Sequence, residues 1–250
     1  MSPPIWTPDA LSSEARPYAQ SIWRVVEAQH RASTMRITDT LEEQAILENL
    51  IEEVKPPVPP ECRGLHYLLY TPFRYAPYPQ GSRFRRARQR EGAFYASERV
   101  ETAIAETAFY RLLFYSEAPA ARLPARPTEH TAFRVAAATD RLIDLTASPL
   151  ARDAALWRHP VDYWPCQELA DAARAARMEA IRYASVRDPE QQANVALLSP
   201  EAFAANAPQV TETWRIFPRS DAVQAWRDFP DALRLEFFRA DFAKDPRIAP

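Results

Sequence analysis

The sequence predicts an α+β fold, and three observations support this class. Segments with strand character are mixed with segments of helical periodicity, without the regular β-α-β order of a doubly wound sheet. The chain has 24 prolines in 250 residues, about twice the usual frequency, which indicates many ordered, non-helical connections. Hydrophobic residues make up 47% and charged residues 26%, so the chain can bury a sizeable core.

The first third of the chain is predicted to contain two helices and two strands. Residues 8–19 are expected to form a short helix capped by Thr7, and residues 21–28 a strand, for which a helical alternative stays open. Asp39 or Thr40 is expected to cap an amphipathic helix that ends near Val54. A proline-rich stretch follows, and residues 65–70 are expected to form a buried strand.

The rest of the chain is predicted to alternate irregularly between strands and helices. The expected strands are 92–97, 131–138, 141–145, 180–185, 193–198 and 211–217. The expected helices are 100–115, 151–157, 163–176 and a tail at 222–240 that Pro230 interrupts. We therefore expect one domain over residues 1–250, with an inserted helix and proline-rich segment at about 38–62 and a helical C-terminal tail at about 220–250.

Glu106 is the unusual residue of the predicted helix at 100–115. Its carboxylate falls within the apolar sector of that helix, between Ile104 on one side and Tyr110 on the other. Burying an unpaired charge is unfavourable, so this position needs an explanation. An ion pair one helical turn away, or a solvated helix edge, would explain it structurally. A functional carboxylate held on a rigid element is the other explanation.

The composition restricts how this protein can bind phosphate. It contains three glycines, so neither a dinucleotide-binding fingerprint nor a Walker loop can be built. Arginine side chains would have to take this role. Five arginines lie between Arg83 and Arg90, and they are open to three interpretations: a solvated loop, a nucleic-acid patch or an anion clamp. The net charge of −2 argues against a general nucleic-acid binder.

Other common site types find no support in the sequence. The four histidines have no ligand spacing between them, so no metal cofactor is expected. Cys62 and Cys166 lie far apart, and we interpret them as reduced thiols of a cytoplasmic protein, with a long-range disulfide as the alternative. No apolar stretch is long enough to span a membrane, and the N-terminal residues do not resemble a secretion signal.

A set of polar residues remains, distributed over short predicted strands and one helix. They are Arg24, Arg83, Tyr95, Glu106 and Ser185. Two of the stretches that contain them, FYASERVETAIAE and IRYASVRDPEQQANVALL, resemble the RES domain family in their order and spacing. LHYLLYTPFR is similar to its longer bacterial branch, and the resemblance extends from about residue 22 to residue 217.

The resemblance implies a fold and a function. Members of this family are similar to toxins of bacterial toxin–antitoxin pairs, with an ADP-ribosyltransferase-like core of short, mostly antiparallel strands in a split sheet or sandwich with flanking helices. They act on NAD+ by hydrolysis, phosphorolysis or transfer of ADP-ribose to a protein. Their partner is usually an Xre-type helix-turn-helix antitoxin that covers the active site. Direct binding to nucleic acid is expected only through that antitoxin.

The resemblance also assigns roles to the five residues. Glu106, Arg24 and Ser185 are expected to be catalytic, and all five to contact NAD+. Gly81-Ser82 stands where the family has a glycine pair, which leaves open whether Arg83, Arg85 or Arg86 contacts the pyrophosphate. The alternative is a non-catalytic interaction or nucleic-acid-binding module that uses the basic loop between Arg83 and Arg90.

Overall fold

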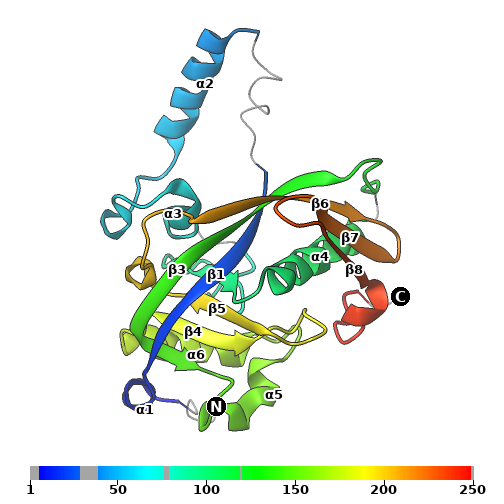
Figure 1. The fold of residues 1–250 in the computed structure, drawn as a ribbon. Helices are drawn as coiled ribbons and strands as arrows, with labels where there is room; N and C mark the ends of the chain where they lie inside the picture. The colour runs from blue at the N-terminus through cyan, green and yellow to red at the C-terminus, as the bar shows by residue number, and fades with distance from the viewer. Residues whose placement is uncertain (1–5, 29–38, 76–78, 119, 249–250) are drawn as a thin grey trace.

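The computed structural model describes residues 6–28, 39–75, 79–118 and 120–248. They form one eight-stranded, mostly antiparallel sheet with flanking helices, which confirms the predicted α+β class (Figure 1). The strands are β1 (Arg16–Glu27), β2 (Phe94–Ser97), β3 (Thr128–Asp144), β4 (Ala180–Ala184), β5 (Ala193–Leu197), β6 (Val210–Pro218), β7 (Ala222–Arg227) and β8 (Leu233–Phe238). The α-helices are α1 (Pro8–Ser13), α2 (Leu41–Val54), α3 (Tyr67–Arg74), α4 (Val100–Glu117), α5 (Ala154–Trp157) and α6 (Trp164–Ala175). Short 3-10 helices are η2 (Pro60–Cys62), η3 (Leu150–Asp153), η4 (Pro200–Ala202) and η5 (Arg239–Phe242).

The long strand β3 divides the sheet into two parts. Its first half pairs antiparallel with both β1 and β6, whereas its last residues pair in parallel with β4. Because β1 also meets β2 at Trp23 and Ser97, strands β1-β2-β5-β4-β3 close into a ring. Strands β6, β7 and β8 extend the sheet beyond that ring. The two strands predicted at 131–138 and 141–145 are therefore one, because Thr139 stays extended and pairs with Tyr18.

Three apolar clusters hold these layers together. The first lies inside the ring, to which all five strands contribute, and its fully buried members include Ile22, Phe94, Phe133 and Leu69 of α3. The second joins the outer face of β4 and β5 to α1, α5 and α6. The third packs α4 against β6, β7 and β8, so that Ile104 and Phe109 lie with Trp214. Helix α4 is therefore fixed along its length by buried residues, which makes it a rigid support for polar side chains at its edge.

The core position of Ile104 gives a testable stability difference. Ile104 is fully buried in α4, whereas Ile46 on α2 is 54% exposed. We expect Ile104→Val to lower the free energy of unfolding by about 1 kcal/mol, because a buried methylene is lost and a small void remains. Ile46→Val, the same change in a solvent-facing helix, is expected to have little effect. Urea denaturation measures both, and equal midpoints for the two variants would contradict the packing described for α4.

Two predicted elements are wrong at the N-terminal side. The helix predicted at 8–19 ends at Ser13, because the residue before Pro17 is disfavoured in helical conformation and β1 begins at Arg16. Residues 65–70 are not a strand, since α3 occupies most of them and His66 caps it. Leu65, Leu69 and Phe73 recur at helical spacing against the ring interior, and that period of four decides the conformation.

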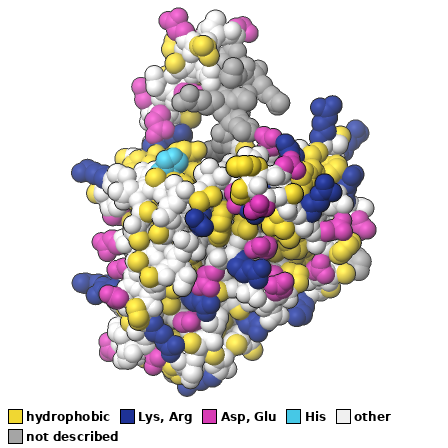
Figure 2. Space-filling model, viewed as in Figure 1, with side chains coloured by type: hydrophobic (Ala, Val, Ile, Leu, Met, Phe, Trp, Pro, Cys, Tyr) yellow, Lys and Arg dark blue, Asp and Glu magenta, His cyan; other side chains and the backbone are white. Residues whose placement is uncertain are grey.

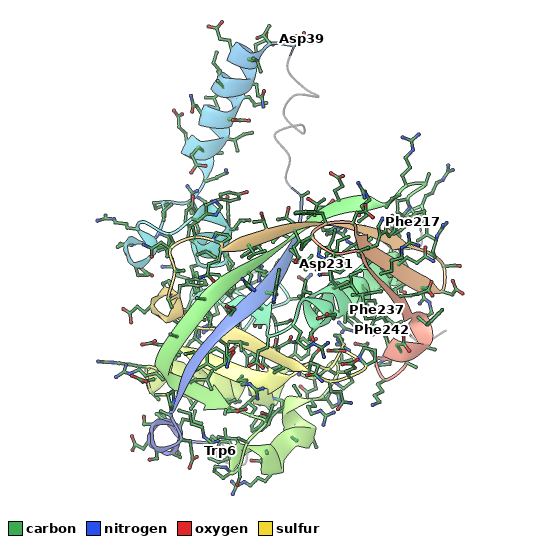
Figure 3. The ribbon with its side chains drawn as sticks, viewed as in Figure 1. Trp6, Asp39, Phe217, Asp231, Phe237 and Phe242 are labelled. Atoms are coloured by element: carbon green, nitrogen blue, oxygen red, sulfur yellow. The ribbon has the colours of Figure 1, made fainter. Side chains whose placement is uncertain are left out.

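The predicted helical tail is also wrong. Residues 222–240 form the hairpin of β7 and β8, and only η5 follows as a helical turn. Strand β8 alternates, with Leu233, Leu235 and Phe237 toward α4 and the residues between them exposed. This period of two is a strand signal, and the turn sequence DFPD around Pro230 is typical of a hairpin connection. Phe237 and Phe242 lie beside each other at this end of the sheet (Figure 3).

Helix α2 projects from the body of the molecule (Figure 1). Its predicted cap is confirmed: Thr40 and Glu43 form a reciprocal capping box. The helix carries both acidic and apolar side chains at its surface (Figure 2), including Ile46, Leu50 and Val54, which are four residues apart and exposed. No helix within the described ranges is long and apolar enough to cross a membrane.

Candidate active site

Glu106 lies where α4 passes the ends of β4 and β5, and two side chains hold its carboxylate. Its Oε1 atom accepts hydrogen bonds from Ser185 Oγ at 2.7 Å and from Asn194 Nδ2 at 2.6 Å. Asn194 in turn accepts from Ser97 Oγ at 2.6 Å, so β2 and β5 both support the arrangement. Both partners of Glu106 are buried. Two of the five predicted site residues, Glu106 and Ser185, are therefore in direct contact.

The second carboxylate oxygen of Glu106 has a different environment. No side chain or main-chain group of the described residues donates a hydrogen bond to Oε2, and none of their basic groups forms an ion pair with Glu106. The carboxylate is half-buried in the middle of α4 and not at a frayed end. The explanation by an ion pair one helical turn away therefore finds no support among the described residues. A carboxylate oriented through one oxygen keeps the other for a ligand.

The Ser185 hydroxyl is fully engaged in hydrogen bonds. Besides donating to Glu106, Oγ accepts from the main-chain N–H groups of Arg187 at 3.2 Å and Asp188 at 3.0 Å. A hydroxyl has one proton and two lone pairs, and all are used here. Ser185 is completely buried as well. These contacts suit a residue that positions Glu106 and the turn after β4, rather than one that attacks a substrate.

Arg83 is a buried cation near the same end of the sheet. It is 8% exposed, and its Nη1 atom donates to the carbonyl oxygens of Trp157 at 2.7 Å and His159 at 3.1 Å. Its guanidinium lies 4.6 Å from the ring centroid of Tyr163. No carboxylate among the described residues forms an ion pair with it. A buried guanidinium of this kind is suited to an anionic ligand.

The neighbouring arginines are engaged differently. Arg86 forms ion pairs with Glu168 and Asp171 of α6 and lies over the ring of Trp164. Arg85 is buried and donates to carbonyl oxygens of its own loop. Arg83 and Arg85 therefore turn inward, whereas Arg88 and Arg90 of the same loop are exposed. Of Arg83, Arg85 and Arg86, Arg86 is matched in charge by the two carboxylates of α6.

Tyr95 fixes the loop that carries Arg83. Its hydroxyl is 2.8 Å from Ser82 Oγ and accepts a hydrogen bond from the main-chain N–H of Phe84 at 3.0 Å. Burial raises the pKa of the Tyr95 phenol above its ordinary value, so the hydroxyl stays protonated. These contacts of the Tyr95 hydroxyl do not include Glu106. The hydroxyl holds the residues on both sides of Arg83 instead.

Comparison with known proteins shows the family. A model of the RES domain matches residues 58–219, which is more than half of the chain. The chain belongs to the RES domain family. The match includes Arg83, Tyr95, Glu106 and Ser185, whereas Arg24 lies before it and strands β7 and β8 lie beyond it.

The sequence similarity to a solved structure is low. A solved structure similar to this RES protein is the crystal structure of the M. tuberculosis MbcT–MbcA toxin–antitoxin complex. The two chains are 12% identical, the similarity covers 82% of this chain and 89% of that one, and the TM-score is 0.47. A search of curated proteins found no match.

Arg24 occupies a different face of the RES core from Tyr95. Its Nη1 atom donates to the main-chain carbonyl of Tyr95 at 2.7 Å, and its guanidinium lies 5.0 Å from the ring centroid of Phe94. Phe94 faces the ring interior, while the side chain of Tyr95 packs with the cluster under α6. In the structure, Glu106 contacts Ser185, and Tyr95 contacts the loop that carries Arg83. Arg24 lies on the opposite face of β2 from the Tyr95 side chain.

Sequence reasoning missed two residues of this RES site. Asn194 is the second hydrogen-bond donor to Glu106. Tyr183 is buried on β4, near both Glu106 and Arg83. The Tyr183 ring makes an edge contact with Phe84 at 4.9 Å. Burial first, and then the Glu106 charge, raises the pKa of the Tyr183 phenol well above its ordinary value. Tyr183 and Asn194 both lie within the stretch IRYASVRDPEQQANVALL, where Asn194 is a polar residue inside an otherwise apolar strand.

The described residues contain no group of three or more His, Cys, Asp or Glu side chains that could hold a metal ion. Cys62 and Cys166 are separate buried thiols.

Proposed function

We propose that this RES domain protein is the toxin of a bacterial toxin–antitoxin pair and consumes NAD+. The reaction would cleave the bond between nicotinamide and ribose and pass ADP-ribose to water, phosphate or a protein side chain. Membership of the RES family supports the proposal. The observation that carries it is the Glu106 carboxylate, which Ser185 and Asn194 hold through one oxygen while the other accepts no bond from the described residues.

Glu106 is proposed to stabilise the charge that develops on the ribose. When the bond from the anomeric carbon to nicotinamide breaks, the electron pair leaves with the ring and neutral nicotinamide is released. The ribose becomes oxocarbenium-like, as at other glycosidic carbons. A carboxylate beside it accepts a hydrogen bond from a ribose hydroxyl and stabilises the positive charge. Because the leaving group is already cationic in NAD+, it departs without prior protonation.

The remaining residues would bind and orient NAD+. Arg83 is proposed to contact the pyrophosphate, because its fork of N–H groups matches phosphate oxygens and it lacks a described carboxylate partner. Tyr95 keeps Arg83 in place through Ser82 and Phe84. Arg24 is proposed to support the site from the other face of β2, where its guanidinium donates a hydrogen bond to the main-chain carbonyl of Tyr95. Ser185 acts through Glu106.

The acceptor then completes the reaction. Water, phosphate or a protein nucleophile forms a bond to the anomeric carbon and loses a proton, which gives ADP-ribose, ADP-ribose 1-phosphate or an ADP-ribosylated protein. Incubating the purified protein with NAD+, with and without phosphate, and separating the products by chromatography tests the proposal. Release of nicotinamide in equal amount to the ADP-ribosyl product is the expected result. Failure to release nicotinamide with water, phosphate or added cell protein as acceptor would overturn the proposal.

The role of Ser185 leads to a further prediction. We expect Ser185→Ala to lower kcat for NAD+ about tenfold, because Glu106 loses one of two donors and the turn after β4 loses its anchor. KM should change less, since the hydroxyl is buried and not open to substrate. Ser12→Ala is the control, because that hydroxyl lies on exposed α1 and bonds only its own helix. A Ser185→Ala enzyme with unchanged kcat would contradict the positioning role.

A cognate antitoxin is the proposed partner. We expect an Xre-type helix-turn-helix protein to cover the site and to act in the cytoplasm, where the NAD+ pool and any protein target are found. Co-purification of the protein with the product of a neighbouring reading frame tests this, with NAD+ turnover as the readout. Bound antitoxin should abolish turnover, and a complex that retains full activity would argue against coverage of the site.

A further inference from the structure

The C-terminal segment after β8 returns to α4 and docks against it. Phe242 of η5 is buried and makes an edge contact with Phe109 of α4 at 5.6 Å, in the region that Figure 3 labels. Ile248 is completely buried, and Arg239 donates to its carbonyl oxygen at 3.1 Å and to Ser116 Oγ on α4 at 3.0 Å. We call residues 239–248 the C-terminal clamp. It lies outside the matched RES range.

Asp245 is the charged residue at the centre of the clamp. Its side chain is completely buried, and its Oδ2 atom is 2.9 Å from Arg187 Nη2. Arg247 donates three hydrogen bonds to the same carboxylate, from its main-chain N–H, Nε and Nη2, at 3.0, 3.0 and 2.7 Å. A buried carboxylate is unfavourable unless it is paired and hydrogen-bonded, and here every described partner is a guanidinium or a main-chain N–H group. The geometry indicates a specific contact to Arg187 rather than general burial of the chain end.

Arg187 connects the clamp to the turn after β4. Its side chain is 4% exposed, lies 3.7 Å from the Phe109 ring centroid, and donates to the Pro160 carbonyl at 2.5 Å. Its main-chain N–H donates to the Ser185 hydroxyl, which in turn donates to Glu106. Asp245 therefore fixes the side chain of Arg187, and the Ser185 hydroxyl fixes its main chain.

The turn after β4 also follows one face of α4. Thr102, Glu106 and Phe109 lie about one helical turn apart on that helix. They contact Asp188, Ser185 and Arg187, respectively: Thr102 Oγ1 donates to Asp188 Oδ2 at 2.7 Å, and the other two contacts are those given above. Without the clamp, the Arg187 end of this turn would lose its ion pair, while the Thr102 end would keep its hydrogen bond.

We propose that Asp245 is a positioning residue for Glu106, so that a C-terminal segment outside the matched RES range completes the site. Asp245 fixes Arg187, Arg187 fixes the turn that presents Ser185, and Ser185 orients the carboxylate. The role in catalysis depends on the proposed function, in which Glu106 stabilises the ribose. The role in ordering the turn does not depend on it.

Asp245→Asn tests the proposal, because it keeps the shape of the side chain and removes its charge. We expect kcat for NAD+ to fall about tenfold, with KM within about twofold of wild type, because the carboxylate is displaced rather than lost. Hydrogen–deuterium exchange in a peptide covering residues 185–190 should become faster. Asp228→Asn is the matched control, since Asp228 pairs with Arg215 at the surface, and it should change neither quantity.

A mutant cycle tests whether Asp245 acts through Arg187. Arg187→Gln alone should lower kcat by a similar factor, and adding Asp245→Asn to it should cause no further loss, because both act through one contact. If Asp245→Asn does not fold, Arg187→Gln alone tests the same contact from the other side, because it removes the charge that pairs with Asp245, and the same losses are expected. Wild-type kcat and wild-type exchange in the variant that folds would overturn the proposal.

The outcomes distinguish this inference from the proposed function. If wild-type protein turns over NAD+ and Glu106→Gln does not, normal kcat in Asp245→Asn rejects the inference alone. If wild-type protein does not turn over NAD+, the proposed function fails and with it the catalytic role of Asp245. The exchange measurement then still decides whether Asp245 orders the turn, and unchanged exchange rejects that as well.

Discussion

Glu106→Gln is expected to lower kcat for NAD+ by about a hundred- to a thousandfold, the largest effect of any single side chain in this protein. The amide oxygen of glutamine can still accept the hydrogen bonds from Ser185 and Asn194, so the local fold should persist. The other terminal atom becomes an uncharged N–H₂ group. It can neither stabilise positive charge on the ribose nor accept from its hydroxyl. The loss should therefore appear in kcat rather than in KM.

Glu101→Gln is the matched control for this change. Glu101 is on the same helix, close in sequence and also half-buried, but its carboxylate pairs with Arg99 at 3.5 Å instead of contacting Ser185 and Asn194. It should retain normal turnover. In cells, wild type and Glu101→Gln should inhibit growth, while Glu106→Gln should not. A Glu106→Gln protein that keeps its fold and consumes NAD+ at a rate close to wild type would remove Glu106 from the mechanism.

The core of the site was predictable because its chemistry resides in two local stretches. Residues 94–106 were expected as a strand followed by a helix, and the structure has β2 and α4 there. The strands on both sides of Ser185 were also expected and are β4 and β5. The family resemblance assigned Glu106 and Ser185 to the same site. Periodicity alone does not predict that contact, because 79 residues separate the two side chains.

The sequence leaves open which of Arg83, Arg85 and Arg86 contacts the pyrophosphate. Arg83, Arg85 and Arg86 lie within four residues, and local patterns treat them alike. The difference between them arises from distant partners: Glu168 and Asp171 on α6 pair with Arg86, more than 80 residues away. An ion pair that long-range folding creates has no signature in composition or spacing.

The errors in α3 and in the C-terminal hairpin have a common cause. Both segments are short and rich in apolar and aromatic residues, so their propensities are weak and the surroundings decide their conformation. The first packs against the ring interior at helical spacing, while Leu233 and Leu235 of β8 face α4 at a period of two. The hairpin error also hid the C-terminal clamp, because a helical tail would not have returned Asp245 to Arg187.

Replacement of Arg83 is expected to cause the second-largest loss. Arg83→Met keeps the length and apolar volume of the side chain but removes the charge, and a charged hydrogen bond to phosphate contributes about 1.5–3 kcal/mol. We expect kcat/KM for NAD+ to fall about 10- to 100-fold, mostly through KM. Arg83→Lys should recover only part of this, because an ammonium group lacks the planar fork that matches phosphate oxygens.

Nicotinamide riboside makes this prediction specific, since it has the same scissile bond as NAD+ but no pyrophosphate. If Arg83 binds the pyrophosphate, Arg83→Met should lower kcat/KM for NAD+ and leave the slower cleavage of nicotinamide riboside unchanged. Arg86→Met is the matched control, because Glu168 and Asp171 already neutralise Arg86, and it should affect neither substrate strongly. Equal losses for both substrates in Arg83→Met would show that Arg83 acts through its contacts to the Trp157 and His159 carbonyls, and that the pyrophosphate is bound elsewhere.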